Sequence, residues 1–281
     1  MAQRLGRSDL VSMRAPLSNL QKRVLSALVI APFILLVALA GGAAFFLIVA
    51  LCAVLGFSEW LRLTNPKAGG DVVFFSFTAL ILTIAIGAWQ TTTIGLIVGA
   101  VLVTAQYFLV VDGKKNETNW VTVGVPYLGG FALALFSLRG LPQGAGLVYY
   151  LLAVVWGTDI GAYLAGRTIG GPKLAPAISP GKTWAGVAGG IILAGVLGFL
   201  IAWLLGARHA WVGLVLAVPV SVASQAGDLF ESWIKRQAGV KESGDLIPGH
   251  GGILDRIDGL IFAAIFFALF QCLIGEPLGW W

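Results

Sequence analysis

The chain has 281 residues, of which 58% are hydrophobic and only 11% are charged. Soluble domains contain about 25% charged residues, and a soluble domain this apolar would not cover its surface with polar groups. The composition therefore excludes a nucleic-acid-binding protein, a disordered chain and a small disulfide-stabilised domain. It predicts an integral membrane protein, in which the net charge of +5 reflects basic cytoplasmic loops.

Apolar segments in chain order predict an all-α integral membrane protein, a polytopic bundle of about nine transmembrane helices. No charged residue occurs between Val24 and Ser58 or between Val72 and Val111, and each run is long enough for two spans of about 20 residues. The pair Gly41-Gly42 and the polar stretch 90–93 divide these runs. The predicted helices cover residues 24–40, 43–62, 72–89, 93–111, 119–138, 145–167, 183–206, 210–234 and 255–275.

The distribution of Lys and Arg predicts a cytoplasmic N-terminus. If the nine helices alternate in direction, 16 of the 18 basic residues lie on the side of the N-terminus, and only Arg139 and Arg208 lie on the other side. Cytoplasmic loops are enriched in Lys and Arg. The chain then divides into a basic cytoplasmic arm (1–23), an N-terminal membrane region (24–138) and a C-terminal membrane region (139–281) with two long cytoplasmic loops.

The beginning of the chain also imitates a signal peptide. A basic stretch and an apolar run end in Ala38-Leu39-Ala40, a pattern typical of a cleavage site. The next apolar segment follows at once, so we expect no cleavage. We expect instead an arm held at the membrane surface by anionic lipid.

A row of charged and hydroxyl side chains ends the eighth predicted helix. Asp228, Glu231, Ser232 and Lys235 have the spacing i, i+3, i+4, i+7, so they share one helix face. Carboxylates in hydrocarbon are costly unless a cation, a partner or a water-filled cavity stabilises them. A local ion pair between Glu231 and Lys235 is the alternative for these two residues. Asp228 has no such partner in its own helix, which favours a functional role.

The ninth predicted helix opens with two carboxylates that follow a glycine-flanked histidine. Asp255 and Asp258 lie where a helix dipole favours negative charge, so simple capping is the alternative. Capping does not explain His250, whose flanking glycines free backbone N–H groups for an anionic ligand. Asp228 at the preceding helix end, together with Asp255 and Asp258, offers three oxygen ligands of the kind that suits Mg²⁺ holding phosphates.

A second polar stretch begins in the sixth predicted helix. Asp159 lies within that helix and is a functional candidate, with a hydrogen bond to a Thr or Tyr as the alternative. In the following loop, Ser179, Lys182 and Thr183 offer donors and a cation at a helix start. The Gly-Lys-Thr sequence is also found in Walker A loops, but Pro176 stands where that motif requires glycine and no strand is expected before it, so we exclude a P-loop. A plain topology signal is the alternative for this basic loop.

Together these residues resemble the phosphatidate cytidylyltransferase (CDP-diacylglycerol synthase) family of bacterial type. The signature of the family is S-x-x-K-R, four residues, K-D, and a segment that ends in P-x-H-G-G-x-x-D-R-x-D. In this chain it reads Ser232-Trp-Ile-Lys235-Arg236, then Lys241-Glu242, then Pro248-Gly-His250-Gly-Gly-Ile-Leu-Asp255-Arg256-Ile-Asp258. The resemblance covers about residues 156–275. Glu242 departs from the Asp of the family, which keeps the charge but displaces it by a methylene.

The resemblance implies transfer of the cytidylyl group of CTP to phosphatidate, giving CDP-diacylglycerol and pyrophosphate at the cytoplasmic side of the bacterial inner membrane. It implies Mg²⁺ as the cofactor, leaves a second monovalent or divalent cation open, and makes membrane lipid a partner. The expected metal ligands are Asp228, Asp255 and Asp258. The residues expected to act in catalysis are Ser232, Lys235, Arg236, His250 and Asp258. The residues expected to bind substrate are Asp159, Lys173, Ser179, Lys182, Thr183 and Lys241.

Two other functions remain open from the sequence. A CTP-dependent lipid or polyprenol kinase would release CDP instead of pyrophosphate. A secondary transporter often has two related halves, whereas here the charged groups crowd one region and nothing comparable is found in residues 24–138. The D-G-x-x-A-R motif of the CDP-alcohol phosphotransferases does not occur in the sequence. The small residues from Gly186 to Gly190 permit close packing within one chain or between two copies, which leaves a homodimer open.

Overall fold

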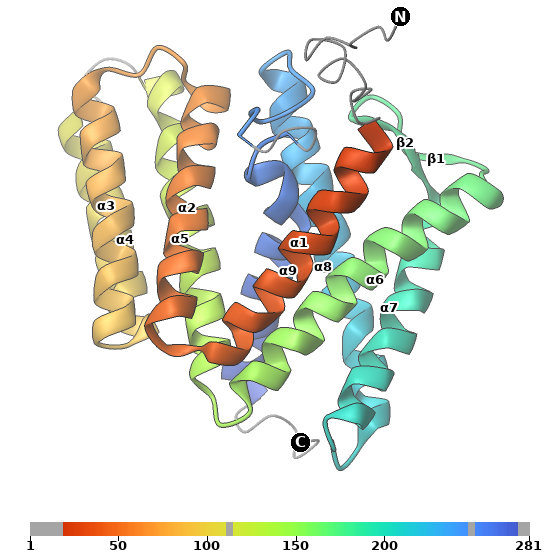
Figure 1. Ribbon diagram of the computed structural model, residues 1–281. Helices are drawn as coiled ribbons and strands as arrows, with labels where there is room; N and C mark the ends of the chain where they lie inside the picture. Colours follow the sequence, from red (N-terminus) through yellow and green to blue (C-terminus); the bar gives the residue numbers. More distant parts are fainter. Residues whose placement is uncertain (1–18, 111–114, 247–250, 275–281) are drawn as a thin grey trace, which may run out of the picture.

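The computed structural model describes residues 19–110, 115–246 and 251–274, which form nine α-helices and one β-hairpin (Figure 1). The elements in chain order are α1 (Asn19–Ala40), α2 (Gly42–Thr64), α3 (Gly70–Trp89), α4 (Thr92–Val110), α5 (Lys115–Gly140), α6 (Gly144–Thr168), β1 (Lys173–Ala175), β2 (Ser179–Thr183), α7 (Trp184–Leu204), α8 (Ala210–Gln237) and α9 (Leu254–Ile274). Residues 1–18 of the predicted arm lie outside the described residues, and α1 begins within the remainder of that arm.

Within the described part of the chain, seven helices are long and apolar enough to cross a membrane: α2, α3 and α5 to α9. The apolar stretches described for α1 and α4 are shorter, at Leu28–Ala40 and Thr92–Gln106. Large apolar side chains such as Leu47 and Trp89 are exposed, as expected where lipid replaces water as the solvent. The prediction of a polytopic helical membrane protein is confirmed.

The helices form two groups that α9 joins. Figure 1 shows α2, α3, α4 and α5 as one group of upright helices, with α6, α7 and α8 on the other side of the molecule. Helix α9 packs on α8 and on α5, and α1 packs on α2 and α6. The hairpin, the ends of α6 and α8 and the beginnings of α7 and α9 lie at the same end of the molecule. Polar segments far apart in the sequence therefore meet at this end.

Trp60 holds α2 against α5 and α8. Its fully buried ring lies 5.1 Å from that of Tyr127 and 6.1 Å from that of Phe230, and its Nε1 donates a hydrogen bond of 2.8 Å to the carbonyl of Trp120. A Cβ at Gly124 would lie 2.5 Å from this ring, so the close approach requires glycine. Burial of an indole with a satisfied N–H is strongly stabilising, and it fixes the adjacent Glu59 in the core.

Helices α6 and α7 touch through small residues. A Cβ at Gly161 would overlap with the carbonyl oxygen of Gly189, and a Cβ at Gly190 would lie 2.9 Å from that of Thr158. Small residues let membrane helices approach at backbone distance. The run Gly186 to Gly190 thus packs against α6 within one chain, and the homodimer stays a prediction.

The antiparallel hairpin β1–β2 differs from the all-helical expectation. Lys173 pairs with Thr183 across it, so the Gly-Lys-Thr sequence lies in a strand. The expectation of no strand in this loop was wrong because both strands are too short to show an alternating pattern. Thr183 also caps α7, where its Oγ1 accepts a hydrogen bond of 3.1 Å from the N–H of Gly186. Pro176 still stands where a Walker A loop requires glycine, so the exclusion of a P-loop is unchanged.

Candidate active site

The polar end of the molecule contains two clusters of charged side chains, which meet at α8. One cluster surrounds Lys235 and the beginning of α9, and we call it the capping network. The other lies between α6, the hairpin, α7 and α8, and we call it the polar pocket. Helix α8 contributes to both clusters, because Lys235 contacts α9 and Asp228 contacts the hairpin.

Lys235 is the centre of the capping network. Its Nζ lies 2.6 Å from Oδ1 of Asp255 on α9, and it forms an ion pair with Glu231 one turn earlier on α8. The Glu231 side chain is only 1% exposed. The spacing-based prediction of a Glu231–Lys235 pair is confirmed, and the structure adds Asp255 as a second partner. A buried cation between two carboxylates holds α8 to α9, because removing Lys235 would leave both carboxylates without their cation.

The second carboxylate oxygen of Asp255, Oδ2, accepts hydrogen bonds from three donors. Oδ2 accepts hydrogen bonds of 2.9 Å from the N–H of Gly252, 2.9 Å from the N–H of Ser243 and 3.0 Å from the Ser243 hydroxyl. Asp255 therefore binds N–H groups of the segment before α9, and not the first N–H groups of the helix itself, so its role as a simple cap stays a prediction. It also ties the connection after α8 to α9.

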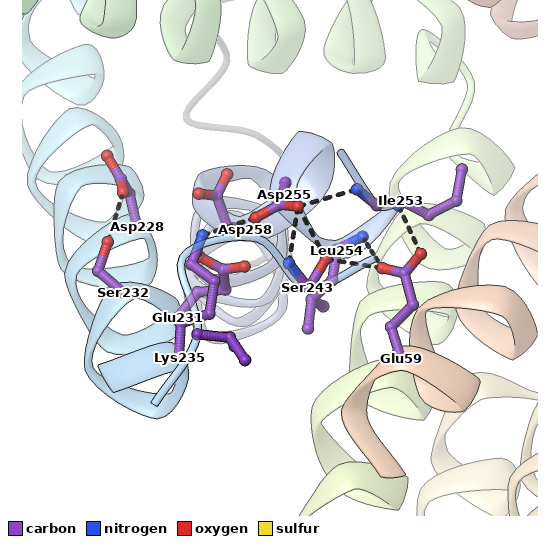
Figure 2. Close-up of polar contacts among 12 residues, drawn as sticks. Glu59, Asp228, Glu231, Ser232, Lys235, Ser243, Ile253, Leu254, Asp255 and Asp258 are labelled. Atoms are coloured by element: carbon purple, nitrogen blue, oxygen red, sulfur yellow. Dashed lines mark hydrogen bonds and ion pairs between the residues drawn. The ribbon is translucent and has the colours of Figure 1, made fainter. Parts of the chain in front are cut away.

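Glu59 completes the capping network from α2 (Figure 2). It is 1% exposed, and its carboxylate accepts hydrogen bonds from the N–H of Ile253 at 2.9 Å, the N–H of Leu254 at 2.8 Å and the Ser243 hydroxyl at 2.8 Å. The described part of residues 24–138 contains no comparable crowd of charged groups, but it does contribute this one carboxylate, which was not selected from the sequence. The sequence did contain a sign of this role, because Glu59 is a single carboxylate within the apolar segment 43–62 and such a residue is a functional candidate by default.

The polar pocket is a cavity of about 310 Å³. Asp159 of α6, Lys182 of β2 and Asp228 of α8 line it, with Tyr163 and Gln225, which the sequence reading did not select. Nζ of Lys182 lies 2.6 Å from Oδ2 of Asp228. The partner of Asp228 thus comes from the hairpin. The two side chains are 25% and 36% exposed, although Nζ of Lys182 is itself buried against Asp228.

Asp258 lies where α8 and α9 come into contact. A Cβ at Gly227 would lie 2.6 Å from the carbonyl oxygen of Asp258, so glycine allows this approach. The carboxylates of Asp228, Glu231 and Asp159 are all near enough to repel that of Asp258. The hydrogen bond seen for its carboxylate among the described residues comes from the N–H of Gly259, at 2.8 Å.

The donor set around Asp258 fits a hard cation. Asp228 and Asp258 are near enough for their carboxylates to repel each other, a cation between them would relieve this repulsion, and Mg²⁺ prefers carboxylate ligands while retaining several waters. Across the described ranges, no three Asp, Glu, His or Cys side chains form a group that could hold a metal ion. A metal here would therefore rest on two protein carboxylates, with water or phosphate oxygens as the other ligands.

The remaining predicted residues surround these two clusters. The Ser232 hydroxyl donates a long hydrogen bond of 3.4 Å to Oδ1 of Asp228 (Figure 2). Arg236 is exposed, and its guanidinium donates to the carbonyls of Ile178 at 3.2 Å and Val240 at 2.9 Å, which joins the hairpin turn to the end of α8. The other predicted residues of this rim are Lys173, Ser179 and Lys241, of which both lysines are exposed.

His250 lies outside the described residues, so its role stays a prediction. Glu242, the departure from the signature, is exposed and precedes Ser243, whose backbone and hydroxyl bind Asp255. If this position only supports the site, the added methylene is tolerable, whereas a direct metal ligand here would shift the affinity for the metal, and both alternatives stay open.

A helical membrane protein with an acidic pocket and a basic rim at one end suits substrates that carry phosphates. The sequence pattern of the cytidylyltransferase family matches residues 21–274. The chain is 42% identical over 267 residues to a phosphatidate cytidylyltransferase of Brucella suis, which covers 93% of this chain and 96% of that protein. Proteins of the same name from Pseudomonas aeruginosa and Staphylococcus haemolyticus are 36% and 31% identical over 89% and 85% of this chain, and over 97% and 94% of their own lengths. The chain belongs to the cytidylyltransferase family.

Proposed function

We propose that this protein transfers the cytidylyl group of CTP to phosphatidate and releases pyrophosphate, so that it is a phosphatidate cytidylyltransferase. One observation carries the proposal. In a chain similar along nearly all of its length to relatives of that name, Asp228 of α8 pairs with Lys182 at the polar pocket, accepts a hydrogen bond from the signature residue Ser232, and lies near enough to repel Asp258 of α9. The pocket combines the two requirements of the reaction, which are a cation for phosphates and carboxylates for a metal.

The phosphates of CTP would lie in the polar pocket. Lys182 would exchange its contact with Asp228 for phosphate oxygens, and the Ser232 hydroxyl, held loosely at 3.4 Å, is free to donate to the same ligand. Lys173, Arg236 and Lys241, with Ser179, would form a rim that attracts the nucleotide. Transfer at phosphorus depends mainly on such positioning and charge neutralisation.

The reaction itself forms one P–O bond and breaks another. A phosphate oxygen of phosphatidate attacks the α-phosphorus of CTP, and the bond from that phosphorus to pyrophosphate breaks. We place the Mg²⁺ on Asp228 and Asp258, where it would neutralise charge on the phosphates. Asp255 and Lys235 would hold the first turn of α9 from behind, because their polar atoms already bind each other and Ser243. A second cation stays a prediction.

The same proposal includes the orientation in the membrane. We assign α1 and α4 as spans with the other seven helices, place the N-terminus in the cytoplasm, and place the polar pocket at the cytoplasmic side of the bacterial inner membrane. The bias of basic residues supports this, since Arg139 and Arg208 belong to connections at the opposite end from the hairpin (Figure 1). Phosphatidate would then enter sideways from the inner leaflet.

Two isotopic labels test the reaction class. Purified protein in vesicles that contain phosphatidate together with diacylglycerol and a polyprenol is given CTP labelled either in the cytosine ring or in the γ-phosphate, with Mg²⁺. The proposal predicts cytosine label in the extracted lipid and γ-label in pyrophosphate. Transfer of the γ-label to lipid would instead identify a lipid kinase, and no label in lipid would contradict both.

A further inference from the structure

We propose that Glu59 of α2 is a positioning residue for the reaction, which it supports by holding the first turn of α9 and, through Ser243, the carboxylate of Asp255. The inference rests on the proposed function and names a residue outside the signature. It gives the N-terminal helix group a direct part in the active site, since Glu59 lies 195 positions before Leu254 in the sequence.

The beginning of α9 needs an external cap. The first N–H groups of a helix have no partner within the helix, and a side chain of Ser, Thr, Asp or Asn usually accepts from them. In this chain the residues at that point are Ile253 and Leu254, which have no polar side chain. The two oxygens of Glu59 accept from these two N–H groups at 2.9 and 2.8 Å. A charged acceptor is strongest in this place, because the helix dipole adds to the hydrogen bonds.

Ser243 passes this constraint to Asp255. Its hydroxyl lies 2.8 Å from Oε2 of Glu59 and 3.0 Å from Oδ2 of Asp255. One hydroxyl hydrogen thus lies between two carboxylates, and Asp255 in turn binds Lys235 at 2.6 Å. A displacement of the Glu59 carboxylate therefore reaches the ion pairs between α8 and α9 directly.

Two positions that contact the Glu59 carboxylate, Gly252 and Gly244, have no room for a side chain. A Cβ at Gly252 would overlap with both Oε2 of Glu59 and the Ser243 hydroxyl, and a Cβ at Gly244 would lie 2.9 Å from Oε1. The chain approaches the carboxylate from two sides at backbone distance. These close contacts depend on a fixed position of the Glu59 side chain. The neighbouring Trp60, which is fully buried, holds this part of α2 in place.

The consequence for the reaction concerns Asp258. It lies one turn after Asp255 in the same helix, so the orientation of the first turn of α9 sets the position of its carboxylate relative to Asp228. The contact of Lys182 with Asp228 involves neither α2 nor α9. Loss of Glu59 should therefore lower kcat and leave the KM for CTP nearly unchanged.

A double-mutant cycle tests the inference. Glu59→Gln keeps the shape but replaces one acceptor oxygen by an amide group that cannot accept, and Ser243→Ala removes the shared hydroxyl. We expect kcat to fall about 100-fold and about 10-fold respectively, the scale that small misplacements near reacting atoms produce. The double variant should be about as slow as Glu59→Gln alone, because both changes interrupt the same chain of contacts. Ser76→Ala is the matched control, since it removes a buried hydroxyl that Gln106 binds between α3 and α4, and its kcat should stay unchanged.

Hydrogen exchange gives a readout independent of activity. In both variants the amide protons of Ile253 and Leu254 should exchange faster, while those of α6 and α7 should not change. If Glu59→Gln does not fold, Ser243→Ala alone still tests the exchange and the kcat. The inference is overturned if kcat per folded protein stays at the wild-type value, or if the two kcat losses multiply. A wild-type protein that places no cytosine label in lipid would overturn the proposed function instead.

Discussion

The capping network and the polar pocket use the same residue types in opposite ways. In the network, Lys235 lies between Glu231 and Asp255, Ser243 lies between Asp255 and Glu59, and the side chains of both glutamates are 1% exposed. In the pocket, the side chains of Lys182 and Asp228 are 25% and 36% exposed, and Asp258 beside it is near enough to three other carboxylates to be repelled by them. A buried cluster whose carboxylates bind a lysine and several N–H and O–H donors holds helices together, whereas a more exposed cluster with fewer bonded carboxylates can accept a charged ligand. The comparison assigns stability to the network and chemistry to the pocket.

The largest effect is expected when Asp258 is changed to Asn. The substitution removes a carboxylate that we assign to the metal and the phosphates, so kcat for lipid labelling should fall about 10³-fold, the scale of losing a main electrostatic contact in a reaction centre. The melting temperature should stay close to that of the wild type, because repulsion from Asp228, Glu231 and Asp159 disappears at the same time. Asp245→Asn, at an exposed position after α8, is the control and should keep both values. A normal kcat in Asp258→Asn would remove Asp258 from the reaction centre.

The opposite pattern is expected when Lys235 is changed to Ala. Glu231 and Asp255 would be left buried without their cation, which costs about 3–5 kcal/mol in the free energy of unfolding. Denaturant unfolding in detergent measures this loss directly. Lys241→Ala, an exposed lysine of the same connection, should change the unfolding free energy little. Equal losses in the two variants would contradict the structural role of the network.

Part of the fold and of the site could be predicted from the sequence. Helix positions followed from apolar runs of membrane length, and the Glu231–Lys235 pair followed from spacing within one helix. The partners of Asp228 and Asp255 did not follow, because Lys182 and Ser243 reach them only through the packing of the hairpin, the connection after α8 and the helices. The hairpin itself was missed since two short strands leave no periodic pattern. Contacts within a helix are thus predictable from spacing, whereas contacts between segments depend on the fold.

Changing Lys182 to Gln should affect binding more than stability. Its partly exposed pair with Asp228 contributes at most about 1 kcal/mol to folding. Charge-assisted hydrogen bonds to phosphate contribute more, so the KM for CTP should rise about 10- to 100-fold. Lys173→Gln, on the neighbouring strand, is the matched control and should raise the KM for CTP less. If the two variants raise the KM equally, the rim and the pocket cannot be distinguished.

The smallest effect is expected for Thr183, which lines the pocket and also caps α7. Thr183→Ala should lower the free energy of unfolding by about 1 kcal/mol through loss of the cap, and Thr183→Ser should retain it. The KM for CTP should rise less in Thr183→Ala than in Lys182→Gln. A larger rise would mean that the hydroxyl serves the nucleotide more than the helix.

The central claim is that CTP binds at the polar pocket and not at the capping network. Hydrogen exchange with and without CTP and Mg²⁺, in vesicles lacking phosphatidate, tests this most directly because no turnover occurs. The account predicts that CTP slows exchange in the hairpin, residues 173–183, and leaves the connection at residues 238–246 unchanged. Protection of residues 238–246 without protection of the hairpin would contradict it.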